Sequence, residues 1–205
     1  MAKILCVEGN IGSGKSTFMA KLKKAFQHRE DICFLDEPVD TWNEFKDKKG
    51  SILEHYYKDQ KFWGFSFQML AYISRLSILR KALEHPGYRF IITERSLFTD
   101  KYVFCKMLYE SDIIHPIQYQ IYQAWFDEFM TKNEYQFIYL RTSPDVALER
   151  VNRRMRKGET IPLAYLEECH RYHEEWLSDA LTFQANVGEH ETSQWISILQ
   201  EKFIL

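Results

Sequence analysis

A glycine-rich loop near the start of the chain has the spacing of a phosphate-binding motif. Residues 9–16 read GNIGSGKS, which fits the pattern GxxxxGK[ST], and they follow a short apolar run. In such a loop the backbone N–H groups and the N-terminus of the next helix hold phosphate oxygens. Lys15 is expected to reach the β- and γ-phosphates, and the hydroxyl of Ser16 to ligate Mg²⁺. The motif predicts a site for a nucleoside triphosphate at Gly9, Asn10, Ile11, Gly12, Ser13, Gly14, Lys15, Ser16 and Thr17.

Two further apolar runs end in ionisable residues. Residues 34–38 read FLDEP, and residues 90–96 read FIITERS. Because ligands of a parallel sheet bind beyond the carboxyl ends of its strands, we expect Glu37, Glu94 and Arg95 to share one cleft with the glycine-rich loop. A carboxylate there can accept the proton of an attacking hydroxyl, and an arginine can stabilise a transferring phosphoryl group. The alternatives are a solvated acid that caps a helix at Glu37 and a surface ion pair at Arg95.

Polar side chains also interrupt an apolar helix predicted from Lys61 to about Glu84. Gln68 and Arg75 are seven residues apart, so they lie along one stripe of this helix. In apolar surroundings both need partners. The amide of Gln68 offers a donor and an acceptor that suit the edge of a nucleobase, and Asp100 could pair with Arg75. Alternatively, both side chains satisfy carbonyl groups of the core or lie at an edge.

A basic segment follows later in the chain. Residues 150–160 read RVNRRMRKGET and join two predicted helices. In phosphoryl-transfer enzymes, mobile arginines close over the phosphates and exclude water. We therefore expect a lid over about residues 150–160, with Gly158 as a hinge; a solvated helix face is the alternative.

The order of apolar runs predicts the scaffold for these groups. Short β-rich runs alternate with helical patterns, which indicates a parallel sheet covered by helices on both faces. We expect an α/β fold in which about five strands form a single domain over residues 1–205. Residues 40–50 are predicted to be a loop. The predicted strands are 3–8, 32–35, 88–93, 136–140 and 181–187, and the predicted helices are 16–27, 61–84, 96–109, 116–130, 144–155, 162–177 and 193–203.

Composition narrows the function classes. The formal net charge of −2 gives no reason to expect a nucleic-acid binder, and no stretch of 18 uncharged apolar residues suggests a membrane span. The first residues lead directly into a predicted strand, so we expect no targeting segment. The four cysteines form no CxxC pair, which favours reduced thiols and a cytoplasmic location: Cys6, Cys33, Cys105 and Cys169.

Several long stretches carry a family resemblance: GNIGSGKST, EPVDTW, YYKDQKFWGFSFQ, ERSLFTDKYVF and IPLAYLEECHRYHEEWL. In this order they resemble the deoxynucleoside kinase family, and the likeness runs from residue 9 to about residue 177. The resemblance implies a P-loop kinase fold with an arginine-rich lid. It also implies ATP as phosphate donor, Mg²⁺, the 5′-hydroxyl of a small-molecule 2′-deoxynucleoside as acceptor, and a role in nucleotide salvage. A homodimer packed through helices is expected, with residues 96–130 as the surface.

The resemblance also implies roles for single residues. Glu37 matches the general base, and Glu94 and Arg95 match a pair that serves Mg²⁺ and the phosphate with the acceptor oxygen. Phe67 resembles the ring that stacks on the base, and Gln68 the glutamine that pairs with its edge. The remaining matches are pocket walls at Trp42 and Phe104, contacts to the 3′-hydroxyl at Tyr57 and Glu159, and lid arginines at Arg150, Arg154 and Arg156. A loop at about residues 185–191 is expected to contact adenine, with no individual contact assigned.

Arg75 and Asp100 bear on the choice of substrate. Family members with this charged pair accept deoxycytidine or purine deoxynucleosides, so the resemblance predicts these substrates over thymidine. A thymidine-accepting or broad-specificity enzyme is the alternative within the family. A thymidylate-type kinase would carry Asp-Arg where this chain has Glu94-Arg95. A GTP-driven switch is a third class, but the DxxG match at residues 47–50 lies in a polar stretch and no NKxD signature is present.

Overall fold

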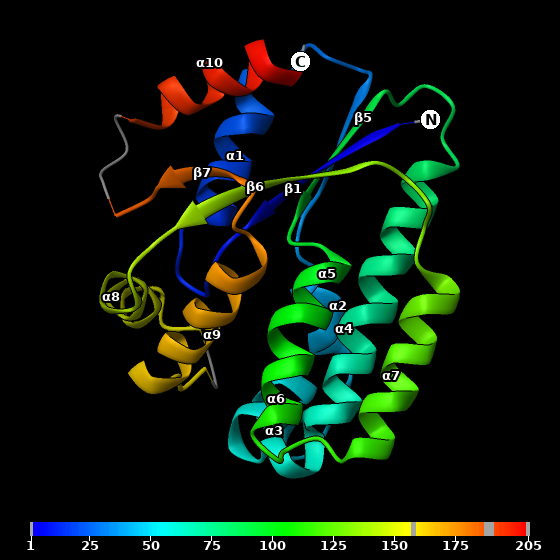
Figure 1. Cartoon of the computed structure of the whole chain (residues 1–205), viewed down its shortest axis with the longest axis vertical. Helices are drawn as coiled ribbons and strands as arrows, with labels where there is room; N and C mark the ends of the chain where they lie inside the picture. The colour runs from blue at the N-terminus through cyan, green and yellow to red at the C-terminus, as the bar shows by residue number, and fades with distance from the viewer. Residues whose placement is uncertain (1, 157–158, 187–190, 204–205) are drawn as a thin grey trace.

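A five-stranded parallel sheet forms the centre of the protein, as predicted (Figure 1). The computed structural model describes residues 2–156, 159–186 and 191–203. The strands are β1 (Lys3–Glu8), β2 (Ile32–Leu35), β5 (Phe90–Glu94), β6 (Tyr135–Arg141) and β7 (Leu181–Gln184), in the order β2-β5-β1-β6-β7. The strand after β1 in sequence lies two places away, and β5 and β6 flank β1. This crossover places the loops after β1, β2 and β5 at one edge.

Successive side chains of β1 point to opposite faces of the sheet and contribute to two separate parts of the core. Leu5 and Val7 pack in a cluster with side chains of α1 (Lys15–Ala25) and α10 (Thr192–Phe203). Ile4 and Cys6 face the opposite side and pack with α4 (Gln60–Leu83) and α7 (Pro116–Phe129). All four side chains are at most 1% exposed, which a strand buried on both faces requires. Figure 1 shows α1 and α10 on one side of the sheet, and α4 and α7 side by side on the other.

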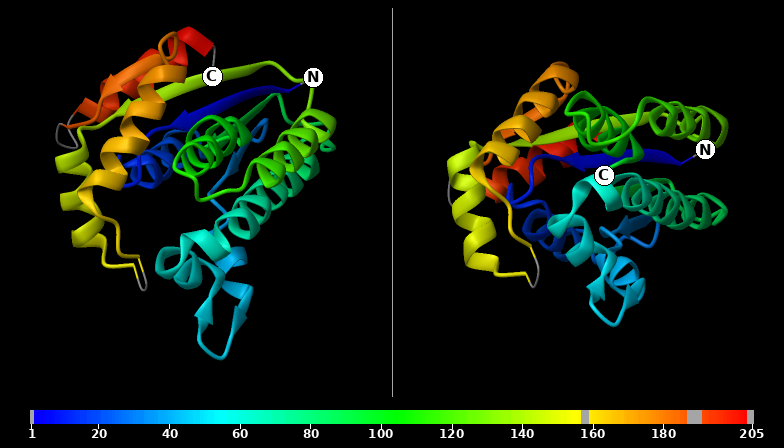
Figure 2. Two further views of the ribbon diagram at one scale, coloured as in Figure 1. Left: turned by 60° about the horizontal axis from the view of Figure 1, so that its bottom comes forward. Right: turned by 90° about the horizontal axis from the view of Figure 1, so that it is seen from below.

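The segment predicted as a loop at residues 40–50 contains regular structure. It holds the short helix α2 (Val39–Glu44) and a hairpin of β3 (Lys46–Asp47) and β4 (Gly50–Ser51). A helix that was not predicted, α3 (Ile52–Lys58), follows directly. Ser51 and Glu54 form a capping box at its start, with each side chain paired to the other residue's backbone N–H. In Figure 2 the hairpin projects from the body of the protein.

The helix predicted at residues 96–109 is divided into three parts. They are α5 (Leu97–Thr99), a π-helical turn (Asp100–Cys105) and α6 (Lys106–Glu110). The predicted helices at 144–155 and 162–177 correspond to α8 (Pro144–Arg154) and α9 (Leu163–Trp176). The last strand ends at Gln184, short of the predicted boundary at Val187, which lies outside the described residues. Within the described part of the chain, no helix combines the length and apolar character needed to cross a membrane.

Candidate functional site

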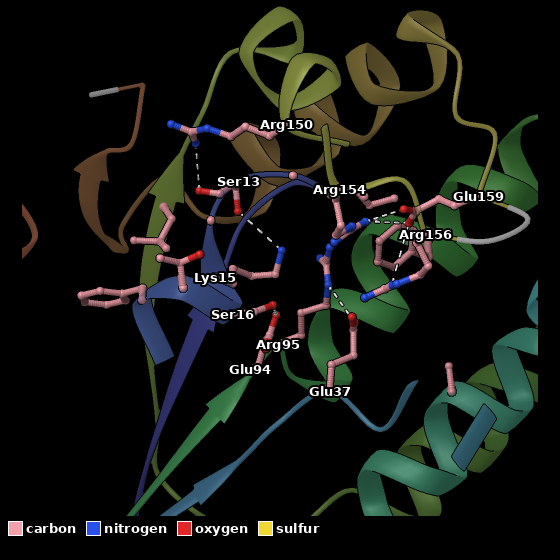
Figure 3. Close-up of a pocket in the computed structure, with 18 of the residues that line it drawn as sticks. Ser13, Lys15, Ser16, Glu37, Glu94, Arg95, Arg150, Arg154, Arg156 and Glu159 are labelled. Atoms are coloured by element: carbon pink, nitrogen blue, oxygen red, sulfur yellow. Dashed lines mark hydrogen bonds and ion pairs between the residues drawn. The ribbon is translucent and has the colours of Figure 1, made fainter. Parts of the chain in front are cut away.

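A cavity of about 610 Å³ opens at the carboxyl ends of β1, β2 and β5. The glycine-rich loop, α2, α3, α4, the π-helical turn and the segment after α8 all contribute to its walls. Among the residues predicted for the site, all line the cavity except Gly9 and Asn10. The topology therefore gathers side chains from positions 11 to 159 into one place (Figure 3).

The glycine-rich loop has backbone angles that favour glycine. Gly12 and Gly14 have φ values of 78° and 94°, and Gly14 caps the N-terminus of α1. The Nζ atom of Lys15 donates to the carbonyl oxygens of Asn10 at 2.7 Å and Gly9 at 3.1 Å. Burial, reinforced by the nearby charge of Arg95, lowers the pKa of Lys15 to about 7, although neighbouring carboxylates oppose the shift.

Asn10 has a supporting position. Its side-chain amide donates to the carbonyl oxygen of Leu166 at 2.8 Å, and its side-chain oxygen accepts from the backbone N–H of Ile11 at 2.8 Å. Asn10 thus joins the glycine-rich loop to α9 with its side chain turned away from the cavity. A phosphate contact of Asn10 would therefore have to come from its backbone, because its side chain is engaged with Leu166 and Ile11.

Ser16 and Glu94 meet where the loop approaches β5. The hydroxyl of Ser16 donates to Oε1 of Glu94 at 2.7 Å, and both side chains line the cavity. Figure 3 shows the two groups beside Lys15, with Glu94 at the end of β5 and Ser16 in the first turn of α1. Two side-chain oxygen atoms therefore face the space next to the glycine-rich loop.

Glu37 lies between two buried arginines. Its Oε1 atom accepts from Nη2 of Arg75 at 2.6 Å and lies 3.2 Å from Nε of Arg95. Burial alone would raise the pKa of Glu37, but Arg75, Arg95 and Lys15 together lower it to about 2. Glu37 is therefore ionised at neutral pH, and the alternative of a solvated helix-capping acid is wrong.

Arg95 is a buried member of the site. It is 4% exposed, so the alternative of a surface ion pair is wrong. Its Nη1 donates to the carbonyl oxygen of Gly9 at 2.9 Å, and its guanidinium lies 5.0 Å from the centre of the Phe104 ring. Its φ of 64° is a left-handed backbone conformation, which is uncommon outside glycine and costs free energy. The surrounding contacts hold this conformation and aim the side chain at the loop.

Arg75 and Asp100 form the predicted pair at the inner end of the cavity. Nε of Arg75 lies 3.1 Å from Oδ2 of Asp100, and Nη1 donates to the carbonyl oxygen of Glu94 at 3.1 Å. The side chain of Asp100 is 2% exposed. Burial raises the pKa of Asp100 to about 6, against the opposing effect of Arg75 and Arg95. Arg75 therefore connects Asp100 to Glu37 as well as pairing with each.

Aromatic rings form the apolar walls next to this pair. The rings of Trp42 and Phe67 meet edge to face at 5.3 Å, and Nε1 of Trp42 donates to Ser74 at 2.9 Å. Gln68 is buried beside them, and its Oε1 has no hydrogen-bond partner among the described residues. A buried amide oxygen without a partner fits a group that receives its hydrogen bond from a ligand.

The rim holds the arginines of residues 150–160. Arg150 points toward the glycine-rich loop and donates to the carbonyl oxygen of Ser13 at 3.4 Å. Arg154 donates to both carboxylate oxygens of Glu159, at 2.6 and 2.7 Å, and Arg156 lies 3.9 Å from the same carboxylate. The hydroxyl of Tyr57 is 3.5 Å from Glu159. Arg150, Arg154 and Arg156 thus line the cavity, while residues 152–155 are exposed, and the predicted hinge at Gly158 lies outside the described residues.

Comparison with known proteins identifies the family. The deoxynucleoside kinase family model matches residues 5–202. This chain belongs to the deoxynucleoside kinase family. It is 37% identical to deoxycytidine kinase of Mus musculus over 85% of this chain and 75% of that protein. It is 35% identical to deoxyguanosine kinase, mitochondrial, of Xenopus laevis, covering 88% and 75%, and 34% identical to thymidine kinase 2, mitochondrial, of Macaca fascicularis, covering 85% and 64%.

The enzyme thus transfers phosphate from ATP to the 5′-hydroxyl of a deoxynucleoside, the reaction of its family. The family match continues beyond residue 177, where the sequence likeness was expected to fade, and includes most of α10. The kinase assignment is therefore confirmed, and so is the α/β fold with its parallel sheet.

Some residues that line the cavity of this deoxynucleoside kinase were not predicted. On the side of α3 and α4 they are Leu53, Tyr56, Ala71 and Tyr165. Near α1 and α10 they are Phe18, Lys21, Leu140, Thr192 and Trp195. Arg153 and Ala185 also line the cavity; they lie in the predicted lid and adenine-contacting loop, where they were not named individually. The S-x-x-E pattern of Ser51 and Glu54 could have located α3 and with it Leu53 and Tyr56.

Proposed function

We propose that this deoxynucleoside kinase prefers deoxycytidine or a purine deoxynucleoside to thymidine. The observation that carries the proposal is the buried Arg75–Asp100 pair beside the unpartnered oxygen of Gln68. A charged pair desolvated next to a base is costly unless it is fully hydrogen-bonded, so it favours a base that offers polar groups there. The same side chains occupy room that a 5-methyl group would need. Phe67 and Phe104 would supply the apolar faces against which the base packs.

The transfer step in this proposal uses Glu37 and Arg95. Glu37 accepts the proton of the 5′-hydroxyl while that oxygen forms a bond to the γ-phosphorus and the bond to the bridging oxygen of ADP breaks. Because the pKa of Glu37 is lowered to about 2, the carboxylate is ready to orient the hydroxyl throughout the neutral range. Arg95, 3.2 Å from Glu37, would hold the acceptor oxygen and the transferring phosphoryl group together.

The donor side is assigned to the glycine-rich loop and the arginines of the rim. Lys15 and the backbone N–H groups of residues 9–17 would hold the β- and γ-phosphates of ATP. Arg150, Arg154 and Arg156 line the same cavity, which supports a lid over about residues 150–160. Arg150 already points at the loop, whereas Arg154 and Arg156 would exchange Glu159 for phosphate oxygens.

The proposal includes Mg²⁺ held by Ser16 and Glu94. A hydroxyl and a carboxylate 2.7 Å apart match the few oxygen ligands that proteins give to Mg²⁺, which keeps waters and substrate phosphates as its other ligands. The described residues contain no cluster of three or more acidic, histidine or cysteine ligands, and a nucleotide-bound ion needs none. When bound, the ion would neutralise charge that develops on the phosphates.

A homodimer is proposed from an apolar stripe on α7. Ile117, Ile121, Trp125 and Phe129 recur every four residues and are all at least 38% exposed. Ile73 of the neighbouring helix α4 is exposed as well. Such a contiguous apolar face suits association with a second copy, and it lies within and beside the predicted residues 96–130.

We also propose that residues 1–205 act as one kinase domain that works in the cytoplasm. The strands of the sheet come from both ends of the described chain, so its halves share one core. The four cysteines are all free thiols, as a reducing compartment favours.

A panel of acceptors tests the proposed preference. The four deoxynucleosides, their ribose counterparts and thymidine monophosphate are each assayed with ATP and Mg²⁺, and kcat/KM is compared. We expect the highest kcat/KM for deoxycytidine, deoxyadenosine or deoxyguanosine, and no significant phosphorylation of thymidine monophosphate. If thymidine has the highest kcat/KM, the role given to Arg75 and Asp100 is wrong, while the kinase assignment stands.

A further inference from the structure

Two consecutive tyrosines of α3 line the cavity, and only the second was predicted as a site residue. The ring of Tyr56 is 2% exposed and packs against the ring of Phe67, with 4.6 Å between centroids. Its hydroxyl lies 2.9 Å from the hydroxyl of Tyr165, in the first turn of α9. Burial raises the pKa of both phenols, so both hydroxyls remain protonated and able to donate.

The Tyr56–Tyr165 contact joins the same two segments as a weaker contact at the rim. Tyr57, the next residue of α3, has its hydroxyl 3.5 Å from Oε1 of Glu159. Glu159 lies six residues before Tyr165, in the chain segment that leads into α9. Tyr57 and Tyr165 also pack against one apolar cluster that contains Ile161. Two polar contacts and a shared core therefore hold α3 against residues 159–165.

The two polar contacts differ in quality. An O···O distance of 2.9 Å is ordinary for hydroxyl groups, whereas 3.5 Å is at the long limit of a hydrogen bond. A 3′-hydroxyl that accepts from Tyr57 and donates to Glu159 would complete the weaker contact. The affinity for the acceptor then depends on the distance between the Tyr57 hydroxyl and the Glu159 carboxylate. The backbones of α3 and of residues 159–165 set this distance. The short Tyr56–Tyr165 contact fixes those backbones.

We propose that Tyr56 and Tyr165 are a hydrogen-bonded pair that positions Tyr57 and Glu159 for the 3′-hydroxyl of the acceptor. The inference rests on the proposed contact of Tyr57 and Glu159 with that hydroxyl. Tyr56 and Tyr165 act through other residues, so they are positioning residues. A purely apolar role would be filled equally well by phenylalanine, because the rings and their packing would remain.

The test combines phenylalanine variants with two acceptors. Tyr56→Phe, Tyr165→Phe and the double variant are compared with the parent on a 2′-deoxynucleoside and on its 2′,3′-dideoxy counterpart. Tyr102→Phe is the matched control, because Tyr102 is 39% exposed and lies outside the cavity-lining residues. For each protein the selectivity is the ratio of kcat/KM between the two acceptors, and thermal unfolding is recorded.

We expect each single variant to lower kcat/KM for the 2′-deoxynucleoside about 3- to 10-fold, chiefly by raising KM. A change of this size corresponds to the loss of one hydrogen bond. The dideoxy acceptor should lose little, so selectivity should fall by the same factor. The double variant should be no worse than either single variant, since both remove the same contact. The control should keep the parent ratio.

Other outcomes overturn the inference. Equal losses on both acceptors would show a general structural effect, and additive losses would show two independent hydroxyls. If the parent itself does not distinguish the two acceptors, there is no 3′-hydroxyl contact to position, and the inference fails even though phosphorylation of deoxynucleosides stands. A parent that phosphorylates no deoxynucleoside would refute the proposed function together with this inference.

Discussion

The buried Arg75–Asp100 pair allows a stability prediction that also bears on substrate choice. The variants are Arg75→Met, Asp100→Ala and the two combined. Each pKa unit corresponds to about 1.4 kcal/mol. The pKa of Asp100 is raised from 3.8 to about 6, so keeping its charge buried at pH 7 costs about 3 kcal/mol even with Arg75 present.

Removal of Arg75 alone should be the most harmful change. Without its partner, the carboxyl of Asp100 would be driven to take up a proton, and holding it protonated at pH 7 costs about 4 kcal/mol relative to the unfolded chain. Arg75→Met therefore adds at most about 1 kcal/mol through Asp100, because protonation limits this cost, and it also loses the contact with Glu37. We expect about 3–5 kcal/mol of destabilisation in total.

The same substitution should cost less when Asp100 is already alanine. Arg75→Met then leaves no unpaired acid at position 100, so its cost should fall by about 1 kcal/mol. Urea unfolding at pH 7 of the parent and the three variants measures this difference as a coupling free energy. Equal costs of Arg75→Met in the two backgrounds would refute the description of the pair as charges that depend on each other.

Kinetics on the same proteins test the link with specificity. The double variant should raise the ratio of kcat/KM for thymidine over deoxycytidine, because it removes the charged edge and opens room beside Gln68. The single variants should shift the ratio less, since each leaves one charge without its partner. An unchanged ratio in the double variant would separate these residues from the choice of base.

Three further outcomes are expected. Glu37→Gln should lower kcat by about 10²-fold or more, while deoxynucleoside binding survives. The control Asp36→Asn, at the exposed neighbouring residue, should keep kcat near the parent value. A near-normal kcat in Glu37→Gln would remove Glu37 from the mechanism. Because the pKa of Asp100 is higher in the folded state, its stabilising contribution is present below pH 3.8 and is lost as the pH rises through about 6. Between pH 5 and pH 8 the parent should therefore lose about 1 kcal/mol more unfolding free energy than Asp100→Asn, and equal losses in urea unfolding would contradict this. Ile121→Lys should shift the protein to monomer in analytical ultracentrifugation, whereas Phe62→Lys, at an apolar and even more exposed position outside the stripe, should not. A dimer that survives Ile121→Lys would exclude the α7 stripe as the interface.

The sequence was sufficient to predict the sheet and the groups at its edge. Alternating apolar runs gave the strands, and the rule that ligands lie beyond the carboxyl ends brought Lys15, Glu37, Glu94 and Arg95 together correctly. This part was predictable because the positions of the strands and of the motif in the sequence both depend on short, local patterns. The identity of the pocket walls needed family resemblance, since an aromatic residue on a helix is ordinarily a core residue.

Local departures from regular periodicity were not predictable. Residues 96–109 have the apolar spacing of one helix, and the π-helical turn at Asp100–Cys105 is an i→i+5 arrangement that such spacing does not reveal. The left-handed backbone of Arg95 depends on contacts with Gly9 and Phe104, which lie far away in sequence. The pairing of Arg154 and Arg156 with Glu159 was not predicted either, although all three residues lie within the same basic segment.

Gly12 has a second constraint besides its backbone angle. A Cβ atom there would lie 2.4 Å from the carbonyl oxygen of Ala147 and 3.1 Å from the side chain of Val151, both in α8. The glycine-rich loop and α8 thus touch without an intervening side chain. This contact sets where Arg150 lies relative to Lys15, and α8 ends soon afterwards at Arg154, where Met155 has a φ of 50°. Substituting Gly12 would push the two elements apart and misalign the site before any nucleotide arrives.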